Sequence, residues 1–405
     1  MSSRIISLYK TAFSGLSKET WLLSLIMLIN RSGTMVVPFM TLYLTSKNMN
    51  YTLSDAGVVI ALFGVGSAVG AYFGGKFTDK FGHYNIQLLS LIGGGILFIV
   101  LGQLKTYWLI CIFTFLLSLV NEAFRPANSS AIAYYSNPGT TTRSYSLNRL
   151  SINLGWAVGG SFGGLIAAYN YELLFWVDGL TNIGAGILLF IFLKAPATKQ
   201  HKTNTSEAVT PLHSAYKDTN YLYFLFFVFL FAFCFFQLFT TVPNFFRDNL
   251  LLSERYIGLL MAINGGIIVA FEMILIHSME RQNRNLTYIA SGLVLCGLAF
   301  LSLLLPGSGA WVSLLMIFLI SAGEIFAMPF MNTFWALRSN ERNRGQYAAM
   351  YTIAWSMAQT TGPFLSTKLV EATNFNVLFY VLAGILMLGA AGFYWLKQKE
   401  FKSKA

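Results

Sequence analysis

The chain has 405 residues, of which 55% are hydrophobic and only 11% are charged, and its mean hydropathy is +0.59. Soluble domains are usually about 25% charged, so this composition cannot supply a normal hydrated surface and excludes an ordinary soluble protein. The alternative solvent is the lipid bilayer, which a helix crosses with about 20 mostly apolar residues.

Twelve apolar segments along the chain are long enough to be transmembrane helices. They are 21–45, 54–74, 84–104, 107–134, 143–169, 171–193, 220–246, 254–278, 285–305, 310–336, 344–371 and 374–396. The polar stretch 194–219 is expected to be a cytoplasmic linker between an N-terminal six-helix half, 21–193, and a C-terminal six-helix half, 220–396. The sequence thus predicts an all-α membrane protein with twelve transmembrane helices.

The basic residues are distributed unevenly about these segments. Of the 27 Lys and Arg, 19 fall on the even-numbered connections, the linker and the two ends, five on the opposite side and three inside predicted helices. Because basic residues favour the cytoplasmic side, residues 1–20 and 397–405 are expected in the cytoplasm and the protein in the cell (inner) membrane. The same distribution accounts for the net charge of +11 without a nucleic-acid partner.

A sequence repeat relates the two predicted halves. Shifting the chain by about 202 residues aligns NEAFRPANSS (121–130) with GEIFAMPFMNT (323–333), which places Glu122 on Glu324, and further along it places Tyr145 on Tyr347. Parallel repeats of this kind occur in transporters, whose substrate site lies near the middle of the membrane between the repeats. The repeat therefore predicts two pseudo-symmetric halves around a central site.

The connection between the second and third predicted helices, GGKFTDKFGHYN (74–85), resembles the signature loop of the major facilitator superfamily. The matching residues are Gly75, Asp79, Lys80 and Gly82, whereas His83 and Tyr84 replace two residues that are usually basic. The resemblance covers the whole chain and implies the major facilitator fold, with the four matching residues in conformational gating. The glycines would allow close helix contact, and Asp79 could cap the positive end of a neighbouring helix.

Seven charged residues lie inside the predicted helices and away from their ends: Arg31, Glu122, Arg125, Arg149, Asp178, Glu272 and Glu324. A charge there costs about 2.5–3.5 kcal/mol on insertion scales, so it must be paired or face a cavity. A rise of about 1.5 Å per residue places Arg31, Glu122 and Glu324 near the middle of the membrane. Arg125 lies one turn from Glu122 on the same helix face, so the two can form an ion pair.

These charges are candidates for proton coupling and gating. Glu324 has no cation within one turn of its own helix, so we expect it to pair across the cavity or to be neutral part of the time, as a proton carrier would. Glu122 and Glu272 are the other candidate carriers. The alternative for Glu122 is a structural ion pair with Arg125, and the alternative for Glu272 is snorkelling toward the membrane surface or a pair between helices. Arg149 is expected to serve the gate, and Asp178 to be structural.

The candidate substrate-binding residues lie on helices that the resemblance places around the central cavity. They are Arg31, Tyr43, Glu122, Arg125, Gln237, Asn244 and Glu324. Arg31 and Arg125 would hold an anionic substrate group or a deprotonated carboxylate. The Phe-rich stretch FAFCFFQLFTTVPNFF (231–246) suggests an amphipathic, partly aromatic substrate, although phenylalanines that simply face lipid explain it equally well.

The stretch INGGIIVAFEMILIHSMERQNRN (263–285) resembles the eighth helix of the twelve-span drug/proton antiporters. This resemblance implies proton-coupled export of a small amphipathic molecule by alternating access, in a monomer. The first helix, NRSGTMVVPFMTLYL (30–44), echoes proton-coupled peptide transporters at Arg31 and Tyr43, but Met27 and Asn30 replace their two glutamates. Because cavity charges of both signs suit a zwitterion, uptake of one such as a short peptide is the alternative, with a lipid-linked substrate as a third. A non-transporting membrane receptor is the contrasting class. The sequence contains no motif for an enzyme, a metal or a cofactor, so the expected partners are substrate, protons and lipid.

Overall fold

The computed structural model of the protein is helical throughout the residues that it describes, 2–46, 49–194, 214–282 and 284–404. Most of the predicted linker, 195–213, lies outside these residues. The first group of helices is α1 (Ser2–Phe13), α2 (Lys18–Ser32), α3 (Val36–Leu44), α4 (Leu53–Phe81), α5 (His83–Gln103), α6 (Tyr107–Glu122), α7 (Phe124–Tyr135), α8 (Thr141–Tyr169) and α9 (Glu172–Phe192). The second group is η1 (Ala215–Lys217), α10 (Thr219–Phe235), η2 (Phe236–Phe239), α11 (Thr241–Asp248), α12 (Glu254–Met279), η3 (Glu280–Gln282), α13 (Asn285–Ser302), α14 (Gly309–Arg338), α15 (Arg344–Ala372) and α16 (Phe375–Lys404).

Ten helical stretches of the described residues are long and apolar enough to cross a membrane, and each coincides with a predicted segment. The predicted first and eleventh segments are not among them. The first, 21–45, was expected to be one helix but is divided into α2 and α3, and neither part reaches 18 residues. The eleventh corresponds to α15, a continuous helix of 29 residues that carries many polar side chains.

The break in the first segment is held by a buried carboxylate. Asp178 on α9 is fully buried and accepts hydrogen bonds from the backbone N–H of Met35, at 2.9 and 3.0 Å, and of Val36, at 2.7 Å. These amides begin α3, so Asp178 satisfies the positive end of a helix that starts inside the membrane. The break also brings Gly33 against Thr181, whose Oγ1 lies 1.7 Å from the position that a Cβ would take.

The predicted seventh helix, 220–246, is also interrupted. It consists of α10, the short 3₁₀ segment η2 and α11. The fully buried side chain of Gln237 joins the parts, because its Nε2 donates to the carbonyl of Phe233 at 2.8 Å and its Oε1 accepts from Thr241 at 2.9 Å. Shifting the first break by about 202 residues places it on η2, so the interruptions occur at corresponding positions of the repeat.

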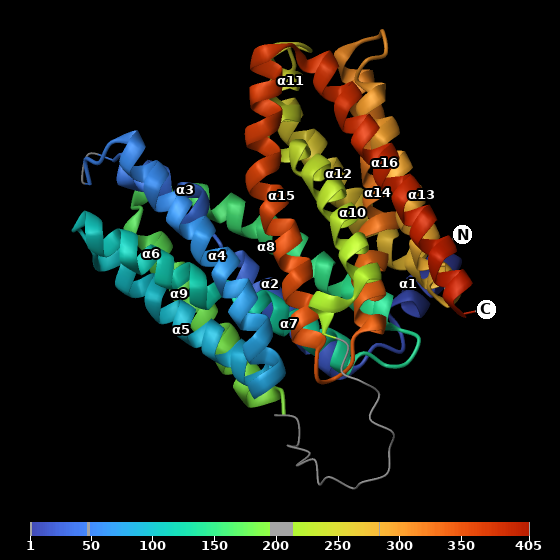
Figure 1. The fold of residues 1–405 in the computed structure, drawn as a ribbon. Helices are drawn as coiled ribbons and strands as arrows, with labels where there is room; N and C mark the ends of the chain where they lie inside the picture. The colour runs from blue at the N-terminus through green and yellow to red at the C-terminus, as the bar shows by residue number, and fades with distance from the viewer. Residues whose placement is uncertain (1, 47–48, 195–213, 283, 405) are drawn as a thin grey trace, which may run out of the picture.

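Helices α2–α9, the N-terminal bundle, and α10–α16, the C-terminal bundle, lie close together at one end and diverge at the other (Figure 1). At the first end, called the closed end, α4 and α7 contact α15, and α8 contacts α12 and α14. Residues 142–148 at the start of α8 are all buried. Toward the other end, which carries α3 and α11, Leu165 of α8 is 70% exposed and Phe364 of α15 is 62% exposed.

Replacing Asp178 with Ala should destabilise the protein by roughly 3 kcal/mol, because the first amides of α3 would lose a charged acceptor inside an apolar medium. Asp178→Asn should cost less, since one oxygen acceptor remains. The measurement is the thermal unfolding midpoint of the full chain in detergent, with Asp248→Asn, at an exposed position, as the control. If the Asp178→Ala protein has the same thermal unfolding midpoint as the wild type, Asp178 does not stabilise the break between α2 and α3.

Candidate functional site

An arginine of the N-terminal bundle connects two carboxylates of the C-terminal bundle. Arg149 on α8 forms an ion pair with Glu272 on α12 and a second one, at 2.5 Å, with Glu324 on α14. The side chains of both glutamates are 3% exposed and that of Arg149 is 12% exposed. Because removing one member of a buried pair leaves an uncompensated charge, this three-residue bridge ties the bundles together.

The second oxygen of Glu324 is held within the C-terminal bundle. Asn264 on α12 donates from Nδ2 to Oε1 of Glu324 at 3.0 Å and to the hydroxyl of Ser321 at 2.9 Å. Glu324 therefore has a partner on each oxygen, and its cation is Arg149. We expected Glu324 to pair across the cavity or to be neutral part of the time. In the structure it pairs with Arg149 of the other bundle, a residue assigned only to gating. Nothing in the sequence pointed to Asn264.

Glu122 and Arg125 form the expected pair on one helix face, with Nη1 of Arg125 at 3.3 Å from Oε2 of Glu122. Glu122 ends α6, and α7 begins two residues later after a joint at Ala123. Arg31 lies in the last turn of α2, directly before the break, and Glu122 and Arg125 are the charged groups that act on it. The structure thus gathers these three residues within the N-terminal bundle.

Three predicted substrate-binding residues are not joined to these charges by any hydrogen bond in the described part of the chain. Tyr43 is buried in the N-terminal bundle, where its ring packs against Tyr171 and Phe175 with centroids 6.3 and 5.0 Å apart. Gln237 is used within the α10–α11 break. Asn244 is exposed on α11.

Asp79, a predicted gating residue, lies at the closed end and caps a helix of the other bundle. Its two carboxylate oxygens accept from the backbone N–H of Gly345 at 2.6 Å and of Gln346 at 2.9 Å, at the start of α15. Gly75, one turn earlier on α4, permits this approach, because a Cβ at that position would lie 2.5 Å from the carbonyl oxygen of Gly345. The carboxylate therefore meets the positive end of α15.

The other two residues of the predicted gating set do not reach the opposite bundle in the contacts described. Lys80 is exposed, and its ammonium lies 5.1 Å from the ring centroid of Phe81 on the same helix. Gly82 joins α4 to α5 with a φ of +85°, a conformation that other residues adopt with strain. Gly82 therefore shapes the turn after Asp79.

A second capping carboxylate at the closed end was not predicted. Glu280 in η3 accepts through Oε1 from the backbone N–H of Thr142 at 2.8 Å and of Arg143 at 3.2 Å, at the start of α8, and through Oε2 from Nε of Arg143 at 2.8 Å. The sequence holds a signal for it, since Glu280-Arg281 stands 201 positions after Asp79-Lys80. The repeat thus places one acidic cap on each bundle.

The first helix, α1, also crosses between the bundles at the closed end. Nη1 of Arg143 donates to the carbonyls of Ala12 and Ser14 at 3.1 and 2.9 Å, and the hydroxyl of Tyr9 donates to the carbonyl of Ala270 on α12 at 2.6 Å. Ala12 is fully buried in a small cluster with residues of α8 and α12. The closed end is therefore sealed by three elements, namely the two acidic caps and α1.

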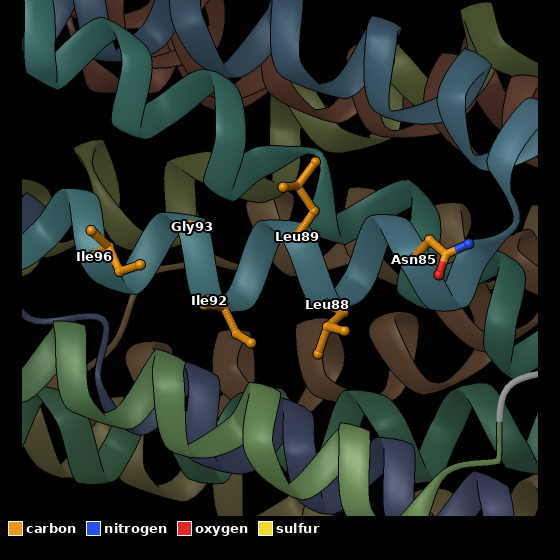
Figure 2. Close-up of a pocket in the computed structure, with 6 residues that line it drawn as sticks. All are labelled: Asn85, Leu88, Leu89, Ile92, Gly93 and Ile96. Carbon is orange, nitrogen blue, oxygen red and sulfur yellow. The ribbon is translucent and has the colours of Figure 1, made fainter.

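A surface hollow along α5 is a different kind of feature (Figure 2). It is lined by Asn85, Leu88, Leu89, Ile92, Gly93 and Ile96, none of which is charged. Leu89 and Ile96 are 63% and 51% exposed. An apolar, open hollow on a single helix is suited to lipid chains, and the buried charges remain the candidate site.

Comparisons with known proteins show what this chain is similar to. The chain is 21% identical over 401 residues to a Na(+), Li(+), K(+)/H(+) antiporter of Planococcus maritimus, covering 91% of this chain and 93% of that protein. It is 23% identical over 363 residues to the quinolone resistance protein NorA of Staphylococcus aureus, covering 87% and 91%. Among solved structures, the human organic anion transporter MFSD10 has a similar fold, with a TM-score of 0.74, 15% identity, and coverage of 92% of this chain and 98% of that one.

The sequence-based resemblance is confirmed by the family model. The model described as "Major Facilitator Superfamily" matches residues 20–357, which include every buried charge of the site. The proteins of this family are multi-pass membrane transporters and not enzymes. The chain therefore belongs to the Major Facilitator Superfamily of membrane transporters.

Proposed function

We propose that this transporter is proton-coupled and exports a small amphipathic organic molecule by alternating access. The observation that carries the proposal is the bridge from Arg149 to Glu272 and Glu324. It joins the two bundles through two carboxylates, which are groups that a proton can neutralise. Export is favoured by the likeness to a protein named for quinolone resistance and to one named as a cation/H(+) antiporter.

The proposal includes twelve transmembrane segments in two six-helix halves, with both ends of the chain in the cytoplasm. The ten clear spans, the divided α2–α3 segment and α15 together supply the twelve. Interrupted helices at corresponding positions of two repeats mark the binding region in many transporters, and here the breaks at α2–α3 and η2 are such a pair. With the basic residues on the cytoplasmic side, the closed end is cytoplasmic and the structure is an outward-facing state.

Protonation would act on the bridge in the following way. When both glutamates are ionised, Arg149 attracts two carboxylates and the bundles stay together at the closed end. A proton on either glutamate removes one of the two attractions, so the free energy that favours the closed arrangement falls. A proton can shift such an equilibrium only by binding the two states with different affinity, and the bridge supplies that difference because it exists only while the bundles are in contact.

The two acidic caps would set how firmly the closed end is held. Asp79 keeps α4 on the start of α15, and Glu280 keeps η3 on the start of α8. Each cap contributes a favourable contact only while the bundles touch, so both would be lost when the closed end opens. They thus stabilise the outward-facing state.

Glu324→Gln should shift the protein toward the state with an open cytoplasmic side, by roughly 100-fold, because one buried ion pair of about 3 kcal/mol is lost. Its conformational equilibrium should also lose part of its pH dependence, since glutamine does not titrate while Glu272 remains paired with Arg149. In the wild type, lowering the pH should increase the open population. Glu272→Gln should act in the same direction.

The measurement is the distance distribution between spin labels at Pro138→Cys and Arg284→Cys, which stand in exposed connections at the closed end, one in each bundle. The three native cysteines are buried and should not be labelled. The exposed Glu371→Gln is the control. A Glu324→Gln protein with the wild-type distances and the wild-type pH dependence would contradict the proposed coupling.

Removing either cap should open the same end. We expect Asp79→Asn to raise the open population by roughly fivefold to 30-fold, which corresponds to about 1–2 kcal/mol for a lost helix cap. Glu280→Gln should raise it more, by roughly 100-fold, because Glu280 also loses its buried ion pair with Arg143. The same pair of labels measures it. The pH dependence should persist in both variants, because Arg149 and its glutamates are unchanged. Distances identical to those of the wild type in both variants would show that the caps are not latches.

A further inference from the structure

Arg31 differs from the other arginines buried between or within the bundles. It is 9% exposed and lies in the last turn of α2, next to the break in the first transmembrane segment. In the described part of the chain its guanidinium has no hydrogen bond or ion pair, whereas Arg125, Arg143 and Arg149 each have a carboxylate partner. An unpaired cation in an apolar medium is costly, so its presence calls for an anion.

The surrounding chain holds Arg31 in place. A Cβ at Gly155 of α8 would lie 2.5 Å from the Cβ of Arg31, and one at Gly159 would lie 3.0 Å from the carbonyl of Ser32. The backbones of α2 and α8 are therefore in close contact at this level, and the backbone and Cβ of Arg31 cannot move away without separating the two helices. The packing of α2 against α8 therefore fixes where the backbone of Arg31 lies in the bundle.

The neighbouring charges do not neutralise Arg31. The charged groups that act on it are Glu122, which attracts it, and Arg125, which repels it. Glu122 is already paired with Arg125 at 3.3 Å, so two cations share one carboxylate. The nearby positive end of α3 cannot serve a second anion, because Asp178 already accepts from its first amides. One positive charge thus remains uncompensated in the N-terminal bundle.

The opposite imbalance exists at the interface. Arg149 faces two carboxylates, Glu272 and Glu324, and both of their charges are directed to it. An incoming ammonium group would have to compete with Arg149 for these two buried carboxylates, although Oε1 of Glu272 accepts no hydrogen bond from the described residues. An incoming anion meets a guanidinium that forms no ion pair with them. The charge distribution distinguishes between substrates of opposite sign.

We propose that Arg31, supported by Arg125, binds an anionic group of the transported molecule, such as a carboxylate, a sulfonate or a phosphate. The inference rests on the proposed transport function and names the chemical class of its substrate, an organic anion. The guanidinium offers a planar set of donors that matches the oxygens of such groups. No ammonium group on the substrate is required in this state.

The first test compares three probes with one aromatic body and different charge: indole-3-acetate, indole-3-acetamide and tryptamine. Benzenesulfonate and phenyl phosphate extend the series to other anionic groups. The full chain in a nonionic detergent is titrated with each, and the rise of the thermal midpoint reports binding. We expect the anions to stabilise the wild type more than the neutral amide and the amine do.

Arg31→Gln should bind the anions about 10- to 100-fold more weakly, as expected for the loss of charge-assisted hydrogen bonds. Arg31→Lys should keep part of the affinity, because it keeps the charge without the planar fork. Arg255→Gln, at an exposed position at the start of α12, should bind like the wild type. The proposal is overturned if the wild type responds to none of the three anions, if tryptamine stabilises it as much as indole-3-acetate, or if Arg31→Gln responds as the wild type does.

The stability of the empty protein separates a binding role from a structural one. Arg31→Gln removes an unpaired charge, so its thermal midpoint without ligand should equal or exceed that of the wild type, as for residues kept for function at a cost in stability. A structural role for Arg31 predicts a lower midpoint instead. A clear decrease would overturn the proposal.

These measurements use no pH gradient and leave Glu272 and Glu324 unchanged. A failure here would remove the organic-anion assignment while leaving the proton-coupling proposal to its own test. Conversely, Glu324→Gln could keep the pH dependence of the wild type, which would contradict the proton coupling, while anion binding that depends on Arg31 persists. The two inferences can therefore fail separately.

Discussion

The structure depends on one constraint, which is that a carboxylate buried in an apolar medium must meet a cation or a positive helix end. Arg149 satisfies the constraint for Glu272 and Glu324 from another bundle. Asp178 satisfies it at the start of α3, and Asp79 and Glu280 do so at the starts of α15 and α8. Where each carboxylate finds its partner therefore decides which helices are held together, and whether a contact lies within a bundle or between the two.

The acidic caps show why a repeat can make a gate. The starts of α8 and α15 both lie at the closed end, and each presents unpaired backbone N–H groups and the positive end of a helix dipole. An acidic residue at the end of α4, or directly after α12, meets the helix start that faces it. Because the two caps correspond in the repeat, each bundle supplies one carboxylate that caps a helix of the other bundle. Both contacts therefore stabilise the closed end.

The sequence predicted the positions of the helices well, because hydropathy over about 20 residues reflects the membrane itself. It did not predict the breaks after Ser32 and at η2, because those depend on Asp178 and on the side chain of Gln237, whose partners are visible only in three dimensions. The pair Glu122–Arg125 could be predicted, since both residues lie on one helix face. The partner of Glu324 could not, because it comes from α8, and helix depth alone does not tell which of three arginines is near. Glu280 could have been found from the repeat.

Glu122 and Glu324 occupy equivalent positions of the repeat, yet their surroundings give them different capacities. Glu122 is neutralised by Arg125 on its own helix face, so the pair would travel with the N-terminal bundle and would be the same in every state. Glu324 is neutralised by Arg149 across the interface and keeps only Asn264 within its own bundle. If the bundles move apart, Glu122 would keep its cation and Glu324 would lose it, so of these two glutamates only Glu324 would change its affinity for a proton with conformation. Under the proposed coupling, a proton acts through a site whose affinity differs between the states, which favours Glu324 over its twin by the location of its partner, although neither glutamate is unpaired.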